Sequence, residues 1–496
     1  MLSTYPNRAL GRSMRVVLAA LIALVAVAAF GAANSNAAYT APYTTKCTGT
    51  DVSGEGASFQ AVLQPALINY FRTTNQGGQT GGCGSVASPP NLSYTANGSG
   101  AGRRSFGSDG LGRSGVTRYA ATDEPPSIAE ETAMEAAQGT RPSNSAPATG
   151  VGKLGVAPVA AGPVSVLVNF PELCQLPAGD PDLGTYARFQ VSNARMEAVW
   201  TGDASVDTWG EFLPGIQAIP NNIDGKTDTD CQNQTIKRVV RQDSSGTTFA
   251  FKHYLNGINN STGWLSLANQ AWPNSATIIN NQGTGGGALA QKVANTTGSI
   301  GYADLGTGRS KGFQKAPDTT PSDPSAYVYN SGNQVTGYSA GSNEYSFNQS
   351  LFWVALEAAD ATNVTGTGNF IEPSLYSDTN LNGKRGGNCA STTFHNVPLD
   401  GGGRPDSFAN WFNVDGTLGV NGYPSCTLTY FIFWDDPADV YGNTATEMAK
   451  ARTVRDFMLT SVNSGQNVLN ANDYSRLPTS LKNGATYYLN GTSFNK

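Results

Sequence analysis

The chain has 496 residues, of which 39% are hydrophobic and 14% charged, with 58 glycines and a formal net charge of −5. At roughly 100–200 residues per domain, this length predicts two or three domains. The acidic balance excludes nucleic-acid binding by bulk electrostatic attraction, which requires many Lys and Arg to neutralise phosphates. Any anion must therefore be held by local geometry.

Residues 1–37 have the pattern of a secretory signal peptide. Three arginines precede an apolar run at 16–30, and small residues follow as far as Ala37. A membrane anchor would need roughly 20 apolar residues and no such cleavage site. We predict cleavage near Ala37 and export, which leaves 28 Lys and Arg against 36 Asp and Glu, a formal charge of −8.

The predicted mature chain contains six cysteines, an even number that indicates disulfides after export. They are Cys47, Cys83, Cys174, Cys231, Cys389 and Cys426. Six cysteines allow 15 pairings, among which we favour pairing of sequence neighbours. We predict no metal site, because the chain has no Cys-x-x-Cys and only two histidines, His253 and His395. No cofactor is expected either.

Three polar or glycine-rich turns follow in chain order, each at the end of a short apolar segment. Residues 54–58 lead into an apolar stripe at helical spacing from Phe59 to Phe71, with Ser58 at the expected N-cap. Residues 94–102 run from a strand into a glycine turn that contains Ser99. A strand at 119–122 ends at Asp123, which is either a site carboxylate or a helix cap.

Residues 156–169 are almost continuously apolar, as in a strand that is buried on both faces. Residues 238–249 then join a buried strand to a helix through a Ser-Ser-Gly-Thr turn. A helix that begins there presents unpaired amides and a partial positive charge, and Arg241 adds a planar fork of donors. This stretch predicts an anion-binding turn, although an ordinary capped helix beside an arginine would look similar.

The remainder of the chain continues the alternation. Strands are expected at 298–302 and 428–434, and a capping box at Thr444 and Glu447 begins a helix. Residues 361–422 show little periodicity and are expected to form long surface loops. Strands that alternate with helices predict an α/β fold.

Taken together, these segments resemble the substrate-binding protein of Pst-type phosphate ABC transporters. Arg-x-Asp-x-Ser-Gly-Thr-Thr-Phe at 241–249 is the specific element, and the glycine turns gain meaning from their order around it. The other matching segments are 54–59, 98–102, 122–125, 156–169, 199–209, 254–255, 298–302, 423–424, the last helix and 474–478. Together they span most of the mature chain.

The resemblance implies a two-lobed Venus-flytrap fold of periplasmic binding proteins, with the ligand in the cleft between the lobes. We expect lobe I to comprise 38–160 and 415–496, and lobe II to comprise 161–414 with a long loop insertion at about 361–414. The resemblance also implies a set of phosphate-binding residues: Ser58, Phe59, Ser99, Asp123, Arg241, Ser245, Gly246 and Thr247, with Asp243 orienting the arginine.

The chemistry of these residues is consistent with that expectation. An ionised carboxylate only accepts hydrogen bonds. Asp123 would therefore accept a hydrogen bond from the O–H of HPO₄²⁻ or H₂PO₄⁻ and repel SO₄²⁻, which has none. Loss of such a buried hydrogen bond can favour one ligand over another by a factor of roughly 10⁴–10⁵. The family has Thr at the position of Ser58, and the substitution keeps the hydroxyl. Thr44-Thr45-Lys46-Cys47 is not a lipobox, so no lipid anchor is expected at Cys47.

The sequence therefore predicts an exported protein, periplasmic, wall-associated or secreted, which binds inorganic phosphate and delivers it to the permease of an ABC importer. We expect a monomer without enzymatic activity and without nucleic-acid partners. One alternative is a secreted phosphatase that uses hydroxyls at 244–248, but His253 lies two helical turns away and would not reach them as a base. Another is a phosphate-binding or structural protein without a role in transport.

Overall fold

In a computed structural model of the chain, the described residues are 45–74, 81–136, 152–177, 179–184, 188–202, 206–220, 224–259, 263–267, 269–273, 278–280, 284–313, 327–329, 335–338, 351–360, 363–374, 389–416 and 422–491. The predicted signal peptide at 1–37 lies outside them. Across the described residues, no helix has the length and hydropathy needed to cross a membrane.

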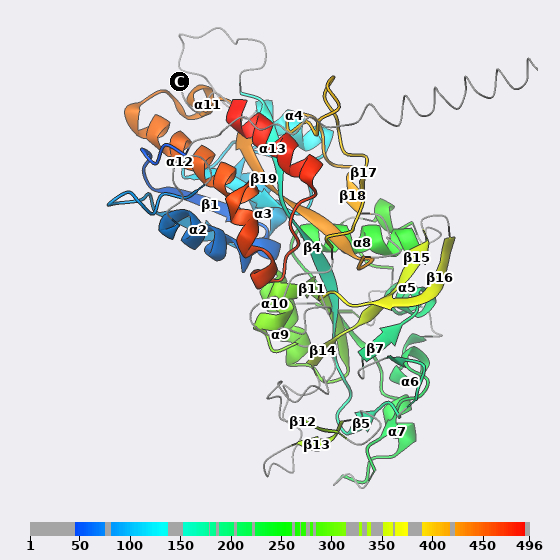
Figure 1. The fold of residues 1–496 in the computed structure, drawn as a ribbon. Coiled ribbons are helices and arrows are strands. Elements are labelled where there is room, and N and C mark those ends of the chain that lie inside the picture. The colour runs from blue at the N-terminus through cyan, green and yellow to red at the C-terminus, as the bar shows by residue number, and fades with distance from the viewer. Residues whose placement is uncertain are drawn as a thin grey trace, which may run out of the picture.

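A nine-stranded mixed sheet extends through both lobes of the molecule (Figure 1). Its order is β10-β9-β11-β4-β19-β3-β1-β2, and β14 also pairs with β4. The strands are β1 (Val52–Gly56), β2 (Leu92–Thr95), β3 (Thr117–Thr122), β4 (Leu154–Asn169), β9 (Lys237–Val240), β10 (Ile278–Asn280), β11 (Ser299–Asp304), β14 (Leu351–Trp353) and β19 (Cys426–Trp434).

Strand β4 connects the two halves of this sheet. Nine of its first ten residues pair with β19, and its last six pair with β11, with β14 also bonded near the end. All 16 residues of β4 are buried, as the apolar run at 156–169 predicts. A strand buried along its whole length cannot shift register without exposing apolar surface, so β4 fixes both halves of the sheet to one frame.

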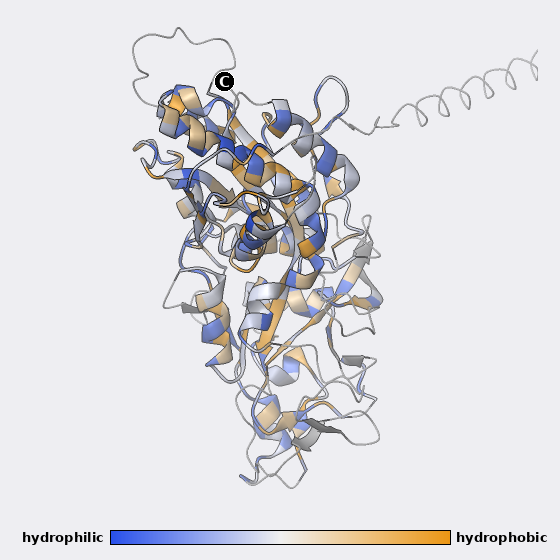
Figure 2. Cartoon of the chain, turned by 60° about the vertical axis from the view of Figure 1, so that its left-hand side comes forward, coloured by the Kyte–Doolittle hydropathy of each residue, from blue (hydrophilic) through white to orange (hydrophobic). Residues whose placement is uncertain are grey.

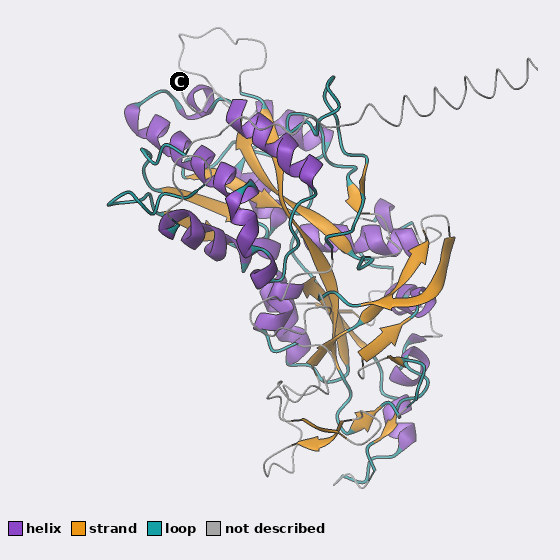
Figure 3. Ribbon diagram, in the orientation of Figure 1, coloured by secondary structure: helices purple, strands orange, loops and turns teal. Residues whose placement is uncertain are grey.

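Helices cover the sheet on both sides (Figure 3). Around the N-terminal strands lie α2 (Leu63–Thr73), α3 (Ser99–Ser105), α4 (Ile128–Ala136), α11 (Pro437–Tyr441), α12 (Ala445–Val462), α13 (Thr479–Gly491) and the 3₁₀ turns η1 (Ser58–Gln60), η6 (Ser464–Val468) and η7 (Asn470–Asn472). Around the other end lie α5 (Asn193–Thr201), α6 (Trp209–Phe212), α7 (Asp228–Gln232), α8 (Gly246–Ile258), α9 (Gly286–Ala294), α10 (Leu305–Ser310) and η4 (Trp264–Ser266).

Apolar residues concentrate along the interior strands, and the covering helices carry mixed surfaces (Figure 2). In the second lobe, the Trp200 ring packs edge-on against Phe251 and Tyr302, with ring centroids 5.2 and 5.7 Å away. Tyr302 stacks on Phe251 at 4.7 Å. This cluster packs helices α5 and α8 against β11 and so fixes where α8 begins.

Four smaller sheets are present among the described residues. One contains β6 (Leu183–Gly184), β7 (Arg188–Val191), β15 (Ala355–Asp360) and β16 (Asn363–Ile371). The others pair β5 (Cys174–Gln175) with β8 (Gln217–Ala218), β12 (Tyr327–Tyr329) with β13 (Val335–Tyr338), and β17 (Phe394–His395) with β18 (Asp415–Gly416).

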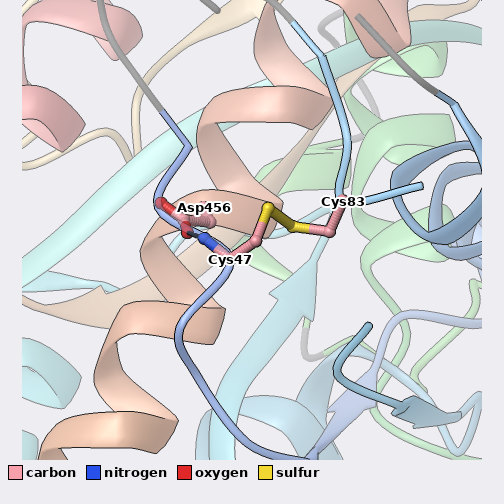
Figure 4. A group of neighbouring side chains, drawn as sticks. All are labelled: Cys47, Cys83 and Asp456. Carbon is pink, nitrogen blue, oxygen red and sulfur yellow. Dashed lines mark hydrogen bonds between the residues drawn. A yellow bond between two sulfur atoms is a disulfide. The ribbon is translucent and has the colours of Figure 1, made fainter. Parts of the chain in front are cut away.

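The six cysteines form three disulfides between sequence neighbours: Cys47–Cys83, Cys174–Cys231 and Cys389–Cys426. The predicted pairing is confirmed. Cys47 and Cys83 lie beside Asp456 of α12, which accepts the Cys47 N–H at 2.8 Å (Figure 4). These three side chains are close enough to suggest a metal site, but a disulfide provides no thiolate ligands. The group instead ties the N-terminal segment to α12.

The prediction of surface loops at 361–422 is wrong for part of this span. Residues 363–371 form β16, which pairs with β15 at the edge of its sheet. An edge strand with partly exposed residues needs few apolar side chains, so its sequence gives little signal. Residues 375–388 and 417–421 lie outside the described residues.

Residues 389–414, expected in lobe II, contact elements that were assigned to lobe I. The Val156 N–H donates to the Ser407 carbonyl at 2.8 Å, and Asn410 Nδ2 donates to the Pro126 carbonyl at 3.0 Å. Tyr488 Oη donates to Asp400 Oδ2 at 3.2 Å. The lobe boundaries at 160/161 and 414/415 remain predictions.

Candidate anion-binding site

The turn after β9 begins helix α8 as the sequence predicts. Ser245 is the N-cap, and its hydroxyl accepts the Thr248 N–H at 3.1 Å. The α8 helix has 13 residues, so its dipole places a partial positive charge at Gly246 and Thr247. Ser245 and Thr247 are buried. This turn therefore presents donors inside the protein.

Arg241 lies directly before this turn and is buried, with 2% of its surface exposed. Its Nε donates to Asp243 Oδ1 at 2.5 Å, and its Nη2 is paired with Asp243 Oδ2. Nη1 donates to Ser58 Oγ at 3.2 Å, across to the η1 turn. Asp243 thus orients the guanidinium and leaves the Nη1 side directed toward Ser58.

Ser58 does not act as the predicted helix cap. The α2 helix begins at Leu63, because Pro65 suits a first turn and not a helix interior. The Ser58 hydroxyl accepts from Arg241 and from the Gly286 N–H, the latter at 2.8 Å. The ring of Phe59, by contrast, is buried edge-on against Tyr474 at 5.7 Å, which anchors η1 in the core.

Asp123 is a buried carboxylate that accepts three hydroxyl hydrogen bonds. Ser99 Oγ and Thr247 Oγ1 both lie 3.3 Å from Oδ2, and Thr429 Oγ1 lies 2.8 Å from Oδ1. It is not a helix cap, because α4 begins later and Ser127 and Glu130 form its capping pair. Asp123 therefore joins β3, α3, α8 and β19 at one point.

Burial raises the pKa of Asp123 to about 7. The Thr429 hydroxyl, the Arg241 charge and the Ser99 and Thr247 hydroxyls each act to lower this pKa. Desolvation outweighs them because water has been replaced by neutral dipoles and a single cation that is already paired with Asp243. At neutral pH this carboxyl is close to half ionised.

The starts of α3 and α8 pack closely against each other, with glycines and serines at the contact. A Cβ on Gly246 would lie 2.6 Å from Ser99 Oγ and 2.6 Å from the Glu124 N atom. A Cβ on Gly98 would lie 2.6 Å from Asp243 Oδ2. The Gly100 N–H donates to the Ser244 carbonyl at 3.1 Å. Glycine is needed at these positions because the two turns approach so closely.

The structure brings all nine predicted residues into one region and adds groups that the sequence analysis missed. Gly285 and Gly286 at the start of α9 donate backbone N–H bonds to Asp243 Oδ1, at 3.4 Å, and to Ser58 Oγ. The signal was present: Thr284-Gly285-Gly286-Gly287 follows a strand and precedes apolar residues at helical spacing. Thr429 gave no such signal, because it looks like any residue of a buried strand.

His253 packs against an aromatic ring of the same helix. Its ring lies 4.4 Å from that of Phe249, and burial lowers the pKa of His253. Within the described part of the chain, His253 makes no hydrogen bond to the turn at 244–248. The arrangement places hydroxyl, amide and guanidinium donors around a buried carboxyl acceptor, which suits a tetrahedral oxyanion that carries a proton.

Comparison with known proteins adds evidence at the level of fold. No protein-family model and no curated protein sequence matches the chain. A solved phosphate-binding protein from Stenotrophomonas maltophilia aligns with a TM-score of 0.50 and 16% identity, over 88% of this chain and 93% of its own.

Two further structures align comparably well. A high-affinity periplasmic phosphate-binding protein bound with phosphate has a TM-score of 0.49 and 18% identity, covering 87% of this chain and 92% of its own. A human phosphate-binding apolipoprotein has a TM-score of 0.48 and 18% identity, with the same coverage. At such identities the likeness shows the fold alone. The chain has the two-lobed α/β fold of periplasmic binding proteins, as predicted.

Proposed function

We propose that this chain is an extracytoplasmic binding protein for inorganic phosphate. The observation that carries the proposal is Asp123, a buried carboxyl with hydroxyls on both oxygens, placed among the arginine and helix-start donors of α8. Phosphate at neutral pH offers both acceptor oxygens and at least one O–H. A site with many donors and one carboxylate acceptor complements phosphate in this way. Sulfate has no O–H that the carboxylate could accept.

The ligand contacts we propose are those predicted from the sequence. Ser58, Ser99, Ser245 and Thr247 supply hydroxyls, Phe59 and Gly246 supply amides, Arg241 supplies the guanidinium, and Asp123 supplies the acceptor. Asp243 keeps the arginine in place. The cleft needs no net positive charge, because short-range dipoles and one cation suffice.

We further propose delivery to an ABC importer of the Pst type, with the permease as partner and the chain acting as a monomer. Two-lobed binding proteins close around a ligand, and such closure presents a distinct surface to a partner. Three disulfides and the predicted signal peptide support export. Cys47 is bonded to Cys83, which agrees with the absence of a lipid anchor there.

Calorimetric titration with phosphate, in the presence and absence of sulfate, tests this function. We expect saturable binding of one phosphate per chain that excess sulfate does not weaken. Equal competition by sulfate would contradict the role of Asp123, and the absence of phosphate binding would contradict the function. Hydrolysis of a chromogenic phosphate ester, lost on Ser245→Ala, would favour the phosphatase alternative instead.

A further inference from the structure

Asp304 is a second buried carboxyl next to the candidate site. It ends β11 and caps α10, and only 1% of its surface is exposed. Its Oδ1 accepts the Thr307 N–H at 2.8 Å and the Tyr474 hydroxyl at 3.4 Å. Its Oδ2 is buried and has no hydrogen-bond partner within the described part of the chain. No pattern in the sequence singles out this residue.

The unpartnered oxygen lies at the start of helix α9, in the same corner as Ser58. A Cβ built on Gly286 would lie 3.6 Å from Ser58 Oγ and 3.7 Å from Asp304 Oδ2. Ser58 accepts bonds from the Gly286 N–H and from Arg241, both of which belong to the site described above. An unsatisfied buried oxygen is costly, and a bound molecule with an O–H at this corner would satisfy it.

Several ionisable groups surround Asp304. Asp123 is close enough for its charge to raise the pKa of Asp304. The others on neighbouring elements are Arg241, Asp243, Tyr302, Lys311, Tyr474 and the Arg309–Asp473 ion pair. Burial is the largest influence and raises the pKa of Asp304 to about 7, while the Thr307 and Tyr474 bonds lower it. This carboxyl therefore exchanges its proton near neutral pH.

We propose that Asp304 is a second specificity-determining carboxyl. A bound oxyanion must then have a second proton in a hydrogen bond between one of its oxygens and Asp304. The proposal rests on the phosphate binding proposed above. Asp123 accounts for one shared proton and Asp304 for the other. The ligand class is thereby narrowed to oxyanions with two protonatable oxygens, of which inorganic phosphate is the common example.

The proton balance distinguishes this arrangement from one that uses Asp123 alone. The complex holds two protons, either as H₂PO₄⁻ between two carboxylates or as HPO₄²⁻ beside an ionised Asp123 and a protonated Asp304. Above neutral pH the free carboxyls carry no proton and free phosphate carries one. Each binding event must then take one proton from the buffer. If Asp123 were the only carboxyl that shares a proton with the ligand, HPO₄²⁻ would bind and no proton would be taken up.

Calorimetry of the full exported chain with inorganic phosphate at about pH 8.5, in two buffers of different ionisation enthalpy, measures this uptake. For the wild type we expect one proton per phosphate and a Kd that rises about tenfold per pH unit above pH 8. For Asp304→Asn we expect no uptake and a Kd that no longer changes with pH. Asn keeps an oxygen for the Thr307 N–H.

Asp435→Asn is the matched control. Asp435 follows β19 at the end remote from Asp304, where burial raises its pKa to about 6 and its Oδ1 is buried without a partner in the described chain. This variant should keep the proton uptake of the wild type. Asp304→Ser, which retains an N-cap acceptor, replaces the Asn variant if that one does not fold.

The outcomes separate the two proposals. Phosphate binding without proton uptake by the wild type, or uptake that persists in Asp304→Asn, overturns the assignment of Asp304 and leaves the proposed function standing. A wild-type protein that binds no phosphate at any pH overturns the proposed function together with this assignment. Uptake that is lost equally in Asp435→Asn would also contradict a specific role for Asp304.

Discussion

In the proposed site, Asp123 distinguishes a ligand that carries an O–H from one that does not. Burial favours its neutral form, while three hydroxyls and Arg241 favour its ionised form, and the balance leaves its pKa at about 7. A ligand with an O–H gives the ionised form a strong acceptor bond, and an anion without one meets repulsion. In the proposed site, the contribution of Asp123 to selectivity therefore depends on its ionised form, which burial disfavours.

Asp123→Asn tests that role directly. Asn keeps the size, removes the charge and adds an amide that can donate to an oxyanion. Phosphate affinity should fall modestly, whereas sulfate should bind much more tightly, so the phosphate-over-sulfate ratio narrows by a large factor. Competition calorimetry with both anions measures the ratio. Continued exclusion of sulfate with unchanged phosphate binding would place the discriminating group elsewhere.

Arg241 is the only full positive charge that we place at the ligand. Arg241→Ala should weaken phosphate binding by at least about 2 kcal/mol, the scale of a lost charge-assisted hydrogen bond. Arg241→Lys keeps the charge but loses the planar fork that Asp243 holds, so it should show an intermediate affinity. A titration isotherm for the Ala variant that matches the wild type would remove Arg241 from the site.

At the scale of elements, the candidate site lies where three helix starts that begin with glycine and serine converge. Helix α3 begins at Gly98-Ser99, α8 at Ser245-Gly246 and α9 at Gly285-Gly286. Each follows a strand of the main sheet, and the contacts between the turns are made by backbone amides, hydroxyls and the Arg241–Asp243 pair. The glycines set the spacing of this arrangement.

Gly98→Ala should therefore disturb binding through Asp243. Gly98 has φ 104°, and a Cβ there would lie 2.6 Å from Asp243 Oδ2. Gly110→Ala is the matched control, since Gly110 has φ 74° but nothing lies within 4 Å of its Cβ position. Gly98→Ala should cost more stability than Gly110→Ala, because Gly98 has ψ 150°, a region that essentially only glycine adopts, and its Cβ would meet Asp243. Only Gly98→Ala should weaken phosphate binding, as measured by calorimetry, and equal affinities in the two variants would argue against the role of this turn.

For the whole molecule, the two buried carboxyls couple stability to pH. The pKa values of Asp123 and Asp304 rise from 3.8 to about 7 on folding. A group whose pKa is raised in the folded state stabilises the fold at low pH, and this contribution is lost as pH rises through the folded pKa. The ligand-free protein should consequently lose stability between about pH 4 and pH 7.

Thermal unfolding followed by circular dichroism across that range measures the effect. The Tm of the wild type should fall as pH increases, and the double variant Asp123→Asn, Asp304→Asn should show a shallower decline. Replacing two groups that titrate on burial by groups that do not removes their share of the proton linkage. A double variant with the same slope as the wild type would mean that other carboxyls, such as Asp435, dominate.

The sequence by itself determined the features that depend on short stretches of chain. The buried strand at 156–169, the Ser245 cap and the start of α8 follow from hydropathy, capping and periodicity, all of which act over a few residues. The signature at 241–249 was specific enough to indicate an anion site, and the order of the turns around it indicated the family's fold. The edge strand β16 was not predicted, because a partly exposed strand needs few apolar residues.

Only the tertiary structure decided which of these local features meet. Ser58 looked like a helix cap, yet its hydroxyl accepts from Gly286, 228 positions later in the chain. Thr429 donates to Asp123 across 306 positions, and nothing in its own neighbourhood distinguishes it from other strand residues. Asp304 had no distinguishing pattern in the sequence, and only the fold places its unpartnered oxygen near the start of α9. Such contacts arise when β4 and β19 bring distant turns together, and no local pattern of residues records that closure.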